Sequence, residues 1–115
     1  MFYALVNPKS IQIHNVKNML SLKQMQELVG IEGESAYIEV SSYRSYSDKS
    51  IVIVADDGFL LKHFSPTCVT AEGTVIHGQV LVLGIDFVNN DFSLLTEKQA
   101  RIVQEETRLY QNLRG

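Results

Sequence analysis

The single cysteine of the chain, Cys68, is the first residue whose type suggests catalysis, because His63 and His77 lie near it in the sequence. A catalytic thiol needs a lowered pKa and a base within hydrogen-bond reach. The residues around Cys68 match none of the local signatures of known cysteine nucleophiles. A lone cysteine is also typical of a small, buried apolar side chain. We therefore expect Cys68 in the core and keep the nucleophile as the alternative.

Metal binding is the second chemistry to consider. His14, His63 and His77 are the candidate ligands, with Asp86 or Asp91 as carboxylate partners. Protein zinc sites usually draw two ligands from one short spacing, such as H-x-x-x-H or C-x-x-C. The chain contains no such spacing. The sequence therefore predicts no metal site and no cofactor.

Paired carboxylates are the third candidate chemistry. General acid–base catalysis needs two such groups whose surroundings push their pKa values apart. Asp56-Asp57-Gly58 is a tight-turn signal, and Asp86 and Asp91 flank Asn89-Asn90, which also favour a turn. We therefore interpret these aspartates as turn-forming residues and predict no catalytic residue among them. Asp86 and Asp91 remain candidate binding residues.

The segment Ser41–Ser50 is the strongest candidate for a binding surface. It combines five serines with Tyr43, Arg44 and Tyr46, and Lys49 adds a second positive charge. Aromatic and arginine side chains on a loop anchor protein partners or stack on nucleobases. Tyrosine with serine is typical of adaptable recognition loops. We expect a polar, partly mobile hairpin loop; the alternative is a solvated loop whose tyrosines lie on the sheet surface.

The composition fits one soluble globular domain. The chain has 115 residues, of which 45% are hydrophobic and 20% charged, enough to bury a core without disulfides. Its net charge of −3 lacks the basic excess typical of proteins that bind duplex nucleic acid, so that partner is not expected. The apolar run Ile51–Ala55 is far too short to span a bilayer. With a single cysteine, a reducing, cytoplasmic location without membrane contact is expected.

Alternation of apolar and polar residues predicts the strands of the first half. Phe2–Val6 and Ile11–Ile13 form a hairpin, and the first of these lacks the charged start of a signal peptide. Ala36–Val40 alternates as a half-buried strand. Ile51–Val54 is apolar on both faces, which predicts a central strand, and Phe59–Leu61 follows as its hairpin partner.

Two capping boxes predict where the helices begin. Ser21 pairs with Gln24, and Thr96 pairs with Gln99, each just before an amphipathic stretch. Gly30 is expected to end the first helix in the left-handed conformation. The second helix is expected to continue along one apolar stripe, formed by Ile102, Val103, Leu109, Tyr110 and Leu113.

The region between the central strands and the last helix has weaker signals. His63–Gly73 has no period and is expected to be a loop, while Val75–Leu83 is the longest strand candidate, with Gly78 as a bulge. Ile85–Leu95 is expected to be an acidic loop. Its Phe87 and Phe92 either rim a pocket or, as is more common, pack against the core.

This order of elements predicts one α+β domain over residues 1–115. Its sheet is mixed or antiparallel, curved, and has five to six strands. A short helix follows the first hairpin, and a second helix is the C-terminal element. The alternative is a small, highly curved sheet that wraps around the short helix.

Several short motifs of the chain also resemble one family. They are Leu28-Val29-Gly30 with Tyr37-Ile38-Glu39-Val40, the strand and acidic turn of Ile51–Gly58, Ile76–Gly84, and Phe92–Thr96. Together they span most of the chain and are similar to the domain of unknown function 3846.

Two positions depart from the pattern of that family. Ala55 stands where an asparagine is expected, and Ser65-Pro66-Thr67 stands where a Pro-x-Asn step is expected. A site formed by those polar positions in the family would therefore differ in this chain. The resemblance implies a small intracellular protein of phages, plasmids or other mobile elements, with no established reaction.

These observations lead to three functional hypotheses. The first is a non-enzymatic, homo-oligomeric module that recognises a host or viral protein through an exposed loop and a sheet edge. The second is a site for a small ligand, such as a nucleotide, between the Ser41–Ser50 hairpin and the Asp86–Phe92 loop. The third, a small hydrolase that uses Cys68 or a carboxylate pair, is the least favoured.

Overall fold

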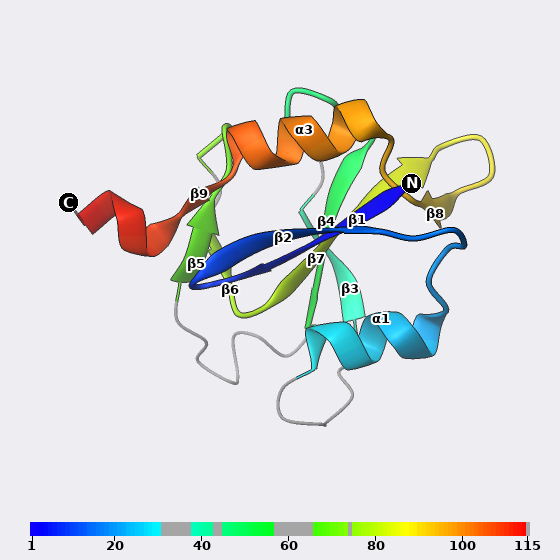
Figure 1. The fold of residues 1–115 in the computed structure, drawn as a ribbon, viewed down its shortest axis with the longest axis horizontal. Helices are drawn as coiled ribbons and strands as arrows, with labels where there is room; N and C mark the ends of the chain where they lie inside the picture. The colour runs from blue at the N-terminus through cyan, green and yellow to red at the C-terminus, as the bar shows by residue number, and fades with distance from the viewer. Residues whose placement is uncertain (31–37, 43–44, 57–65, 74, 115) are drawn as a thin grey trace.

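Strands form most of the regular secondary structure in the described residues, and they belong to two antiparallel sheets (Figure 1). The structure is a computed structural model that describes residues 1–30, 38–42, 45–56, 66–73 and 75–114. The long sheet contains β1 (Phe2–Asn7), β2 (Ser10–Asn15), β3 (Ile38–Ser42), β4 (Ile51–Asp56), β7 (Val80–Asp86) and β8 (Asp91–Ser93). The short sheet contains β5 (Pro66–Val69), β6 (Val75–His77) and β9 (Arg108–Leu109). The helices within this part of the chain are α1 (Leu22–Val29), α3 (Glu97–Glu106) and the 3₁₀ helix η1 (Tyr110–Arg114).

The strand order of the long sheet is β2-β1-β7-β4-β3. Strand β8 pairs with the end of β7 on the side where β1 pairs with its beginning, so β1 and β8 lie end to end along one strand. All of these pairs are antiparallel. The short sheet has the order β6-β5-β9. The predicted α+β class, with an antiparallel sheet, is therefore confirmed.

The long sheet is covered on both faces, and its central strands β4 and β7 bury apolar side chains on both sides. The predicted central strand Ile51–Val54 is buried throughout, and β4 continues through Asp56, which is also buried and so does not lie in the predicted turn. Helix α1 covers one face, and α3 with the short sheet covers the other; Figure 1 shows the two helices on opposite sides. The α1 face buries Tyr3, Met25, Val29, Val54, Leu81, Leu83 and Leu94. The opposite face buries Ala4, Val6, Ile51, Ile53, Val80 and Val82 together with Leu95 and Val103.

Local sequence signals placed the starts of these elements correctly. The β1–β2 turn is held by the Asn7 side chain, whose Oδ1 accepts the N–H groups of Lys9 and Ser10 at 2.9 Å each. Both predicted capping boxes form. The Ser21 hydroxyl accepts the backbone N–H three residues on at 3.1 Å, and the Thr96 hydroxyl does the same.

Both helix ends differ from the prediction. Gly30 has φ −64° and ψ 158°, so it is extended and not left-handed, although its N–H still donates to the Gln26 carbonyl. Helix α3 stops at Glu106, and the chain turns into β9 instead of continuing its apolar stripe. The cause is tertiary, because Leu109 gains a buried position opposite Cys68 in the short sheet.

The region predicted as a loop and one long strand is organised differently. Pro66–Val69 forms β5, with the proline at the first strand position, where its missing N–H costs least. The long strand is two strands in different sheets, β6 and β7. Gly78, with φ +75°, turns the chain between them. The predicted Ile85–Leu95 loop is largely a hairpin of β7 with β8.

Some predictions concern residues outside the described ones: the Asp57-Gly58 part of the turn, the strand Phe59–Leu61 and His63.

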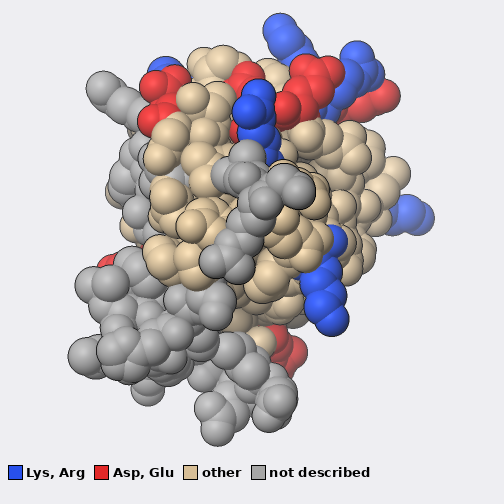
Figure 2. All heavy atoms as spheres, turned by 90° about the vertical axis from the view of Figure 1, so that its left-hand side faces the viewer, with Lys and Arg blue, Asp and Glu red and all other residues tan. Residues whose placement is uncertain are grey.

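No helix in the described part of the chain is long and apolar enough to span a membrane. Charged side chains of both signs gather at the top of Figure 2, over α3. One pair there, Arg101 and Glu97, lies one helical turn apart at 3.3 Å.

Candidate functional site

Tyr46, predicted as a surface recognition residue, is fully buried. Its hydroxyl lies 2.8 Å from the Thr107 hydroxyl, which is also buried. Burial raises the pKa of Tyr46 far above its usual range, so the phenol stays protonated. The surface role predicted for Tyr46 is therefore wrong, because a tyrosine that finds a polar partner inside can bury its whole ring. Tyr43 and Arg44 lie outside the described residues.

The rest of this segment is fixed against α3. The backbone N–H and the hydroxyl of Ser47 both donate to the Glu106 carboxylate. The Ser50 hydroxyl accepts from the Gln99 side chain at 2.8 Å. Residues 45–50 therefore form part of a loop between β3 and β4, as predicted, and these hydrogen bonds attach it to α3. Lys49 is half exposed and lies 3.5 Å from a carboxylate oxygen of Glu72.

Asp86 and Asp91 face each other across the β7–β8 hairpin. Asp86 accepts the N–H of Val88 at 2.9 Å and the side-chain amide of Asn89 at 2.7 Å. The hydrogen bonds from Asn89, and then that from Val88, lower the pKa of Asp86. Asp91 accepts the N–H of Phe92 at 2.9 Å. Both carboxylates therefore shape the turn, in agreement with their interpretation as turn-forming residues.

The tip of this hairpin displays two apolar side chains. Phe87 is 64% exposed and Val88 is 93% exposed, the two highest values for large apolar residues in the described part of the chain. Asn90 has φ +53°, which allows the chain to turn back into β8. The sequence prediction that Phe87 packs against the core or rims a pocket missed this exposure. The available signal was its position inside a run of turn-forming Asp and Asn residues.

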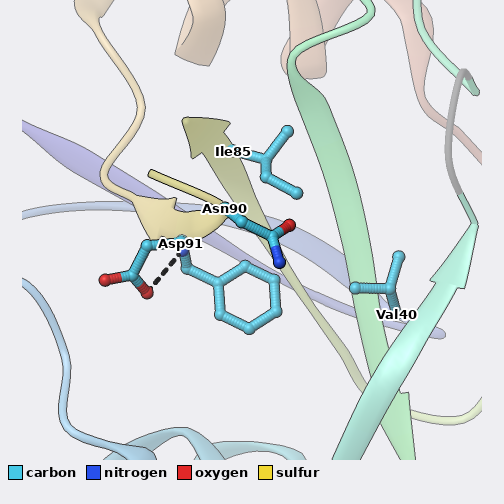
Figure 3. A pocket seen from close by; sticks show the side chains of 5 residues that line it. Val40, Ile85, Asn90 and Asp91 are labelled. Atoms are coloured by element: carbon cyan, nitrogen blue, oxygen red, sulfur yellow. Dashed lines mark hydrogen bonds between the residues drawn. The ribbon is translucent and has the colours of Figure 1, made fainter. Parts of the chain in front are cut away.

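A hollow of about 210 Å³ lies beside the hairpin. Val40, Ile85, Asn90, Asp91 and Phe92 line it, and Figure 3 shows the Asn90 carboxamide directed toward the side of Val40, while the Asp91 carboxylate points away from Val40. The Ile85 N–H donates to the Ser50 carbonyl at 2.7 Å, so the two segments predicted to enclose a ligand do lie side by side, but no described residue that lines the hollow belongs to Ser41–Ser50. Small-molecule sites usually measure roughly 300–1,000 Å³, so the hollow is too small for a nucleotide and matches a single side chain.

A larger cavity of about 460 Å³ lies between the end of β5 and the end of α3. Glu105, Glu106 and Arg108 supply its charged side chains, and two carboxylates beside one guanidinium do not favour a phosphorylated ligand. Thr70 also lines it, with a buried hydroxyl that has no hydrogen-bond partner among the described residues. The Glu106 carboxylate already accepts a hydrogen bond from the Ser47 N–H, so one wall of this cavity attaches the segment of Ser47 to α3.

Cys68 is a core residue, as predicted. It is 1% exposed and lies opposite Ile76 on one neighbouring strand and Leu109 on the other. Burial raises the pKa of its thiol to about 12. The nucleophile hypothesis is therefore wrong for this residue, since almost no thiolate exists at neutral pH and none is accessible.

Within the described residues no group of three or more His, Cys, Asp or Glu side chains is arranged to hold a metal ion. His14, one of the candidate ligands, stacks on Tyr3 with ring centroids 4.9 Å apart and an interplanar angle of 15°. Stacking of this kind is a packing contact and explains the position of the ring.

The chain is therefore a three-layer α+β protein whose described surface offers an apolar hairpin tip and the outer edge of a long strand. No protein-family model, curated protein or solved structure matches it. Its function must be argued from these two features.

Proposed function

We propose that the protein is a non-enzymatic binding module that recognises another protein through the tip of the β7–β8 hairpin. The observation that carries the proposal is the exposure of Phe87 and Val88 on a turn that hydrogen bonds hold in shape. Burying one such side chain in a partner contributes about 1.5–3 kcal/mol. A preorganised turn loses little entropy on binding, so much of that energy remains as affinity.

The surroundings of the tip define the chemistry of the partner. Asp86 and Asp91 close the base of the hairpin with two negative charges. The hollow beside it has apolar walls and one carboxamide, that of Asn90, which suits an apolar side chain with its adjoining peptide group. The partner expected is a protein surface with an apolar pocket rimmed by lysine or arginine.

The proposal includes the cellular setting expected from the sequence. That setting is an intracellular protein of a phage or other mobile element that acts on a host or viral protein, as the short motifs similar to the domain of unknown function 3846 imply, although no family model matches the chain. A nucleotide-binding function is the weaker candidate, because the hollow at the predicted place is small.

The test uses a matched pair of surface variants. Phe87→Ser with Val88→Ser removes the apolar tip, whereas Leu22→Ser removes a 60% exposed apolar side chain from α1. An affinity tag on the chain is used to capture the partner, which mass spectrometry identifies. The tip variant is expected to lose that partner, and the α1 variant is expected to retain it. Equal capture by both variants would contradict the assignment.

A second variant tests the charge of the partner. Asp91→Asn keeps an oxygen that accepts the Phe92 N–H but removes one negative charge. It is expected to weaken partner binding less than loss of the apolar tip does, and binding by the unmodified chain is expected to fall as salt rises. Binding that is indifferent to both changes would exclude a basic rim on the partner.

A further inference from the structure

The outer edge of β2 has its backbone hydrogen-bonding groups directed away from the sheet. The Val16 N–H donates to the Met1 carbonyl at 2.8 Å, which makes these two residues a hydrogen-bonded pair of the β1–β2 ladder. Such pairs alternate with non-bonded pairs along an antiparallel ladder. By the register, the next bonded residues of β2 are His14, Gln12 and Ser10. The peptide groups that face away from β1 therefore belong to Ile11, Ile13 and Asn15.

This edge lacks the features that usually prevent strand addition. Proteins protect edge strands with lysine, proline, bulges or a covering segment. Strand β2 runs through six residues in unbroken register, contains no proline and no Asp, Glu, Lys or Arg, and has no second strand partner among the described residues. The opposite edge strand, β3, contrasts with it, because β3 contains a bulge after Val40 and an exposed Glu39.

We infer that two copies of the chain join through their β2 edges, antiparallel about a two-fold axis, into one continuous sheet. The sequence of the edge indicates a second copy as the occupant, because an uncharged strand faces itself without repulsion. Only the odd-numbered residues of β2 direct their backbone N–H and C=O groups outward. Hydrogen bonds between the two copies must therefore join odd-numbered residues of one strand to odd-numbered residues of the other. Two registers use five residues of each strand; one places Gln12 on the axis, and the other places Ile13 there.

Charge and apolar pairing both select the register with Gln12 on the axis. With Ile13 on the axis, Lys9 would stand opposite Lys17 of the second copy, and like charges directly opposite are unfavourable. With Gln12 on the axis, Lys9 stands opposite an asparagine. In this register Ile11 of each copy also stands opposite Ile13 of the other, which forms two apolar cross-strand pairs instead of one.

The two faces of β2 are suited to this arrangement. Ile11 and Ile13 are half-buried and pack against the core on the α3 face, so their pairing extends that core across the axis. On the α1 face, Gln12 donates to the Ser10 hydroxyl at 3.3 Å and lies 3.2 Å from the His14 ring nitrogen. The same polar row on the second copy would place the two Gln12 amides beside each other, where each can donate and accept.

A charge exchange at the axis tests the inference. The Gln12 side chain is exposed, so Gln12→Lys and Gln12→Glu leave the core of the monomer unchanged. We expect the unmodified chain to show a concentration-dependent monomer–dimer equilibrium by sedimentation velocity. Each variant alone is expected to dimerise at least about ten-fold more weakly, and an equimolar mixture of the two is expected to recover dimers. Gln104→Lys and Gln104→Glu, at an exposed position on α3, are the matched controls and are expected to dimerise like the unmodified chain.

Amide hydrogen exchange measured residue by residue gives an independent test. The N–H groups of Gln12 and His14 are expected to be protected at every concentration, because they bond to β1. Those of Ile11 and Ile13 are expected to gain protection only as the protein concentration rises. An unmodified chain that stays monomeric at several hundred micromolar, or a mixture of variants that does not recover dimers, would overturn the inference. The hairpin tip lies on different strands, so partner capture by Phe87 and Val88 is a separate result.

Discussion

The hydrogen bond between Tyr46 and Thr107 is the contact whose removal tests the described packing most directly. It joins residues 61 positions apart, both of them at most 5% exposed, at an oxygen–oxygen distance of 2.8 Å. Tyr46→Phe keeps the ring and removes the hydroxyl, which leaves the Thr107 hydroxyl buried without this partner. Such a loss costs about 1–3 kcal/mol of unfolding free energy. For a domain of this size, that lowers Tm by roughly 4 °C for each kcal/mol.

A double-mutant cycle separates the bond itself from the general effect of each substitution. Thr107→Val alone leaves the tyrosine hydroxyl without its partner and is expected to cost a similar amount. The double variant removes both polar groups, so its cost is expected to be smaller than the sum of the two by about 1–2 kcal/mol. Urea unfolding followed by circular dichroism measures all four proteins, and the m-value should not change.

The control for this cycle is Tyr110→Phe, at a half-buried tyrosine on η1. It makes the same chemical change outside the Tyr46–Thr107 contact and is expected to change stability by less than about 0.5 kcal/mol. Strictly additive single variants, or a Tyr46→Phe variant as stable as the control, would refute the buried bond. The position of residues 45–50 against α3 would then also need revision.

Three further predictions concern other buried or conformationally restricted positions. Cys68 is expected to resist alkylation at about pH 8 until the protein unfolds, and labelling of the folded protein at the rate of a free thiol would contradict this. Burial raises the pKa of its thiol from the ordinary value of 9.0 to about 12, so its contribution to stability is expected to be full below about pH 9 and to be lost as the pH rises toward 12. Gly78→Ala places a side chain at φ +75° and is expected to cost about 1–2 kcal/mol, measured by thermal unfolding, whereas an unchanged Tm would show that the turn between β6 and β7 does not need that conformation. Thr96→Ala removes the side-chain cap of α3 and is expected to cost about 1 kcal/mol, while Thr96→Ser retains the accepting hydroxyl and should be nearly neutral; equal losses would argue against the cap.

The parts of the fold that could be predicted depend on contacts within a few residues. The β1–β2 turn follows from the Asn7 side chain, and the two helix starts follow from Ser21 and Thr96, which bond to N–H groups two or three residues away. These contacts form independently of the rest of the chain, so the local sequence is enough to predict them. The central position of Ile51–Val54 was also predictable, because only a strand covered on both faces can bury a continuous apolar run.

The parts that could not be predicted depend on partners far along the chain. The apolar period of α3 continues past Glu106, and nothing local stops the helix at that residue. The chain leaves the helix because Thr107 meets Tyr46 and Leu109 meets Cys68, and those contacts bury polar and apolar groups together. The break at Gly78 has the same origin, since β6 and β7 belong to different sheets. Periodicity describes one segment at a time and contains no information about such partners.

The residues that looked chemical in the sequence turn out to satisfy the fold, and this changes how the surface should be interpreted. Asp86 already accepts backbone and side-chain donors of its own turn, so its lowered pKa reflects that turn and not a proton-transfer role. What it still offers a partner is a fixed negative charge next to Phe87 and Val88. The same reasoning applies to β2, where half of the peptide groups are used by β1 and the other half remain free to bond. Each surface thus consists of the groups that the fold itself leaves without an internal partner: apolar side chains at the hairpin tip and peptide groups at the strand edge. Binding is therefore expected at these two places, although neither contains a catalytic pattern.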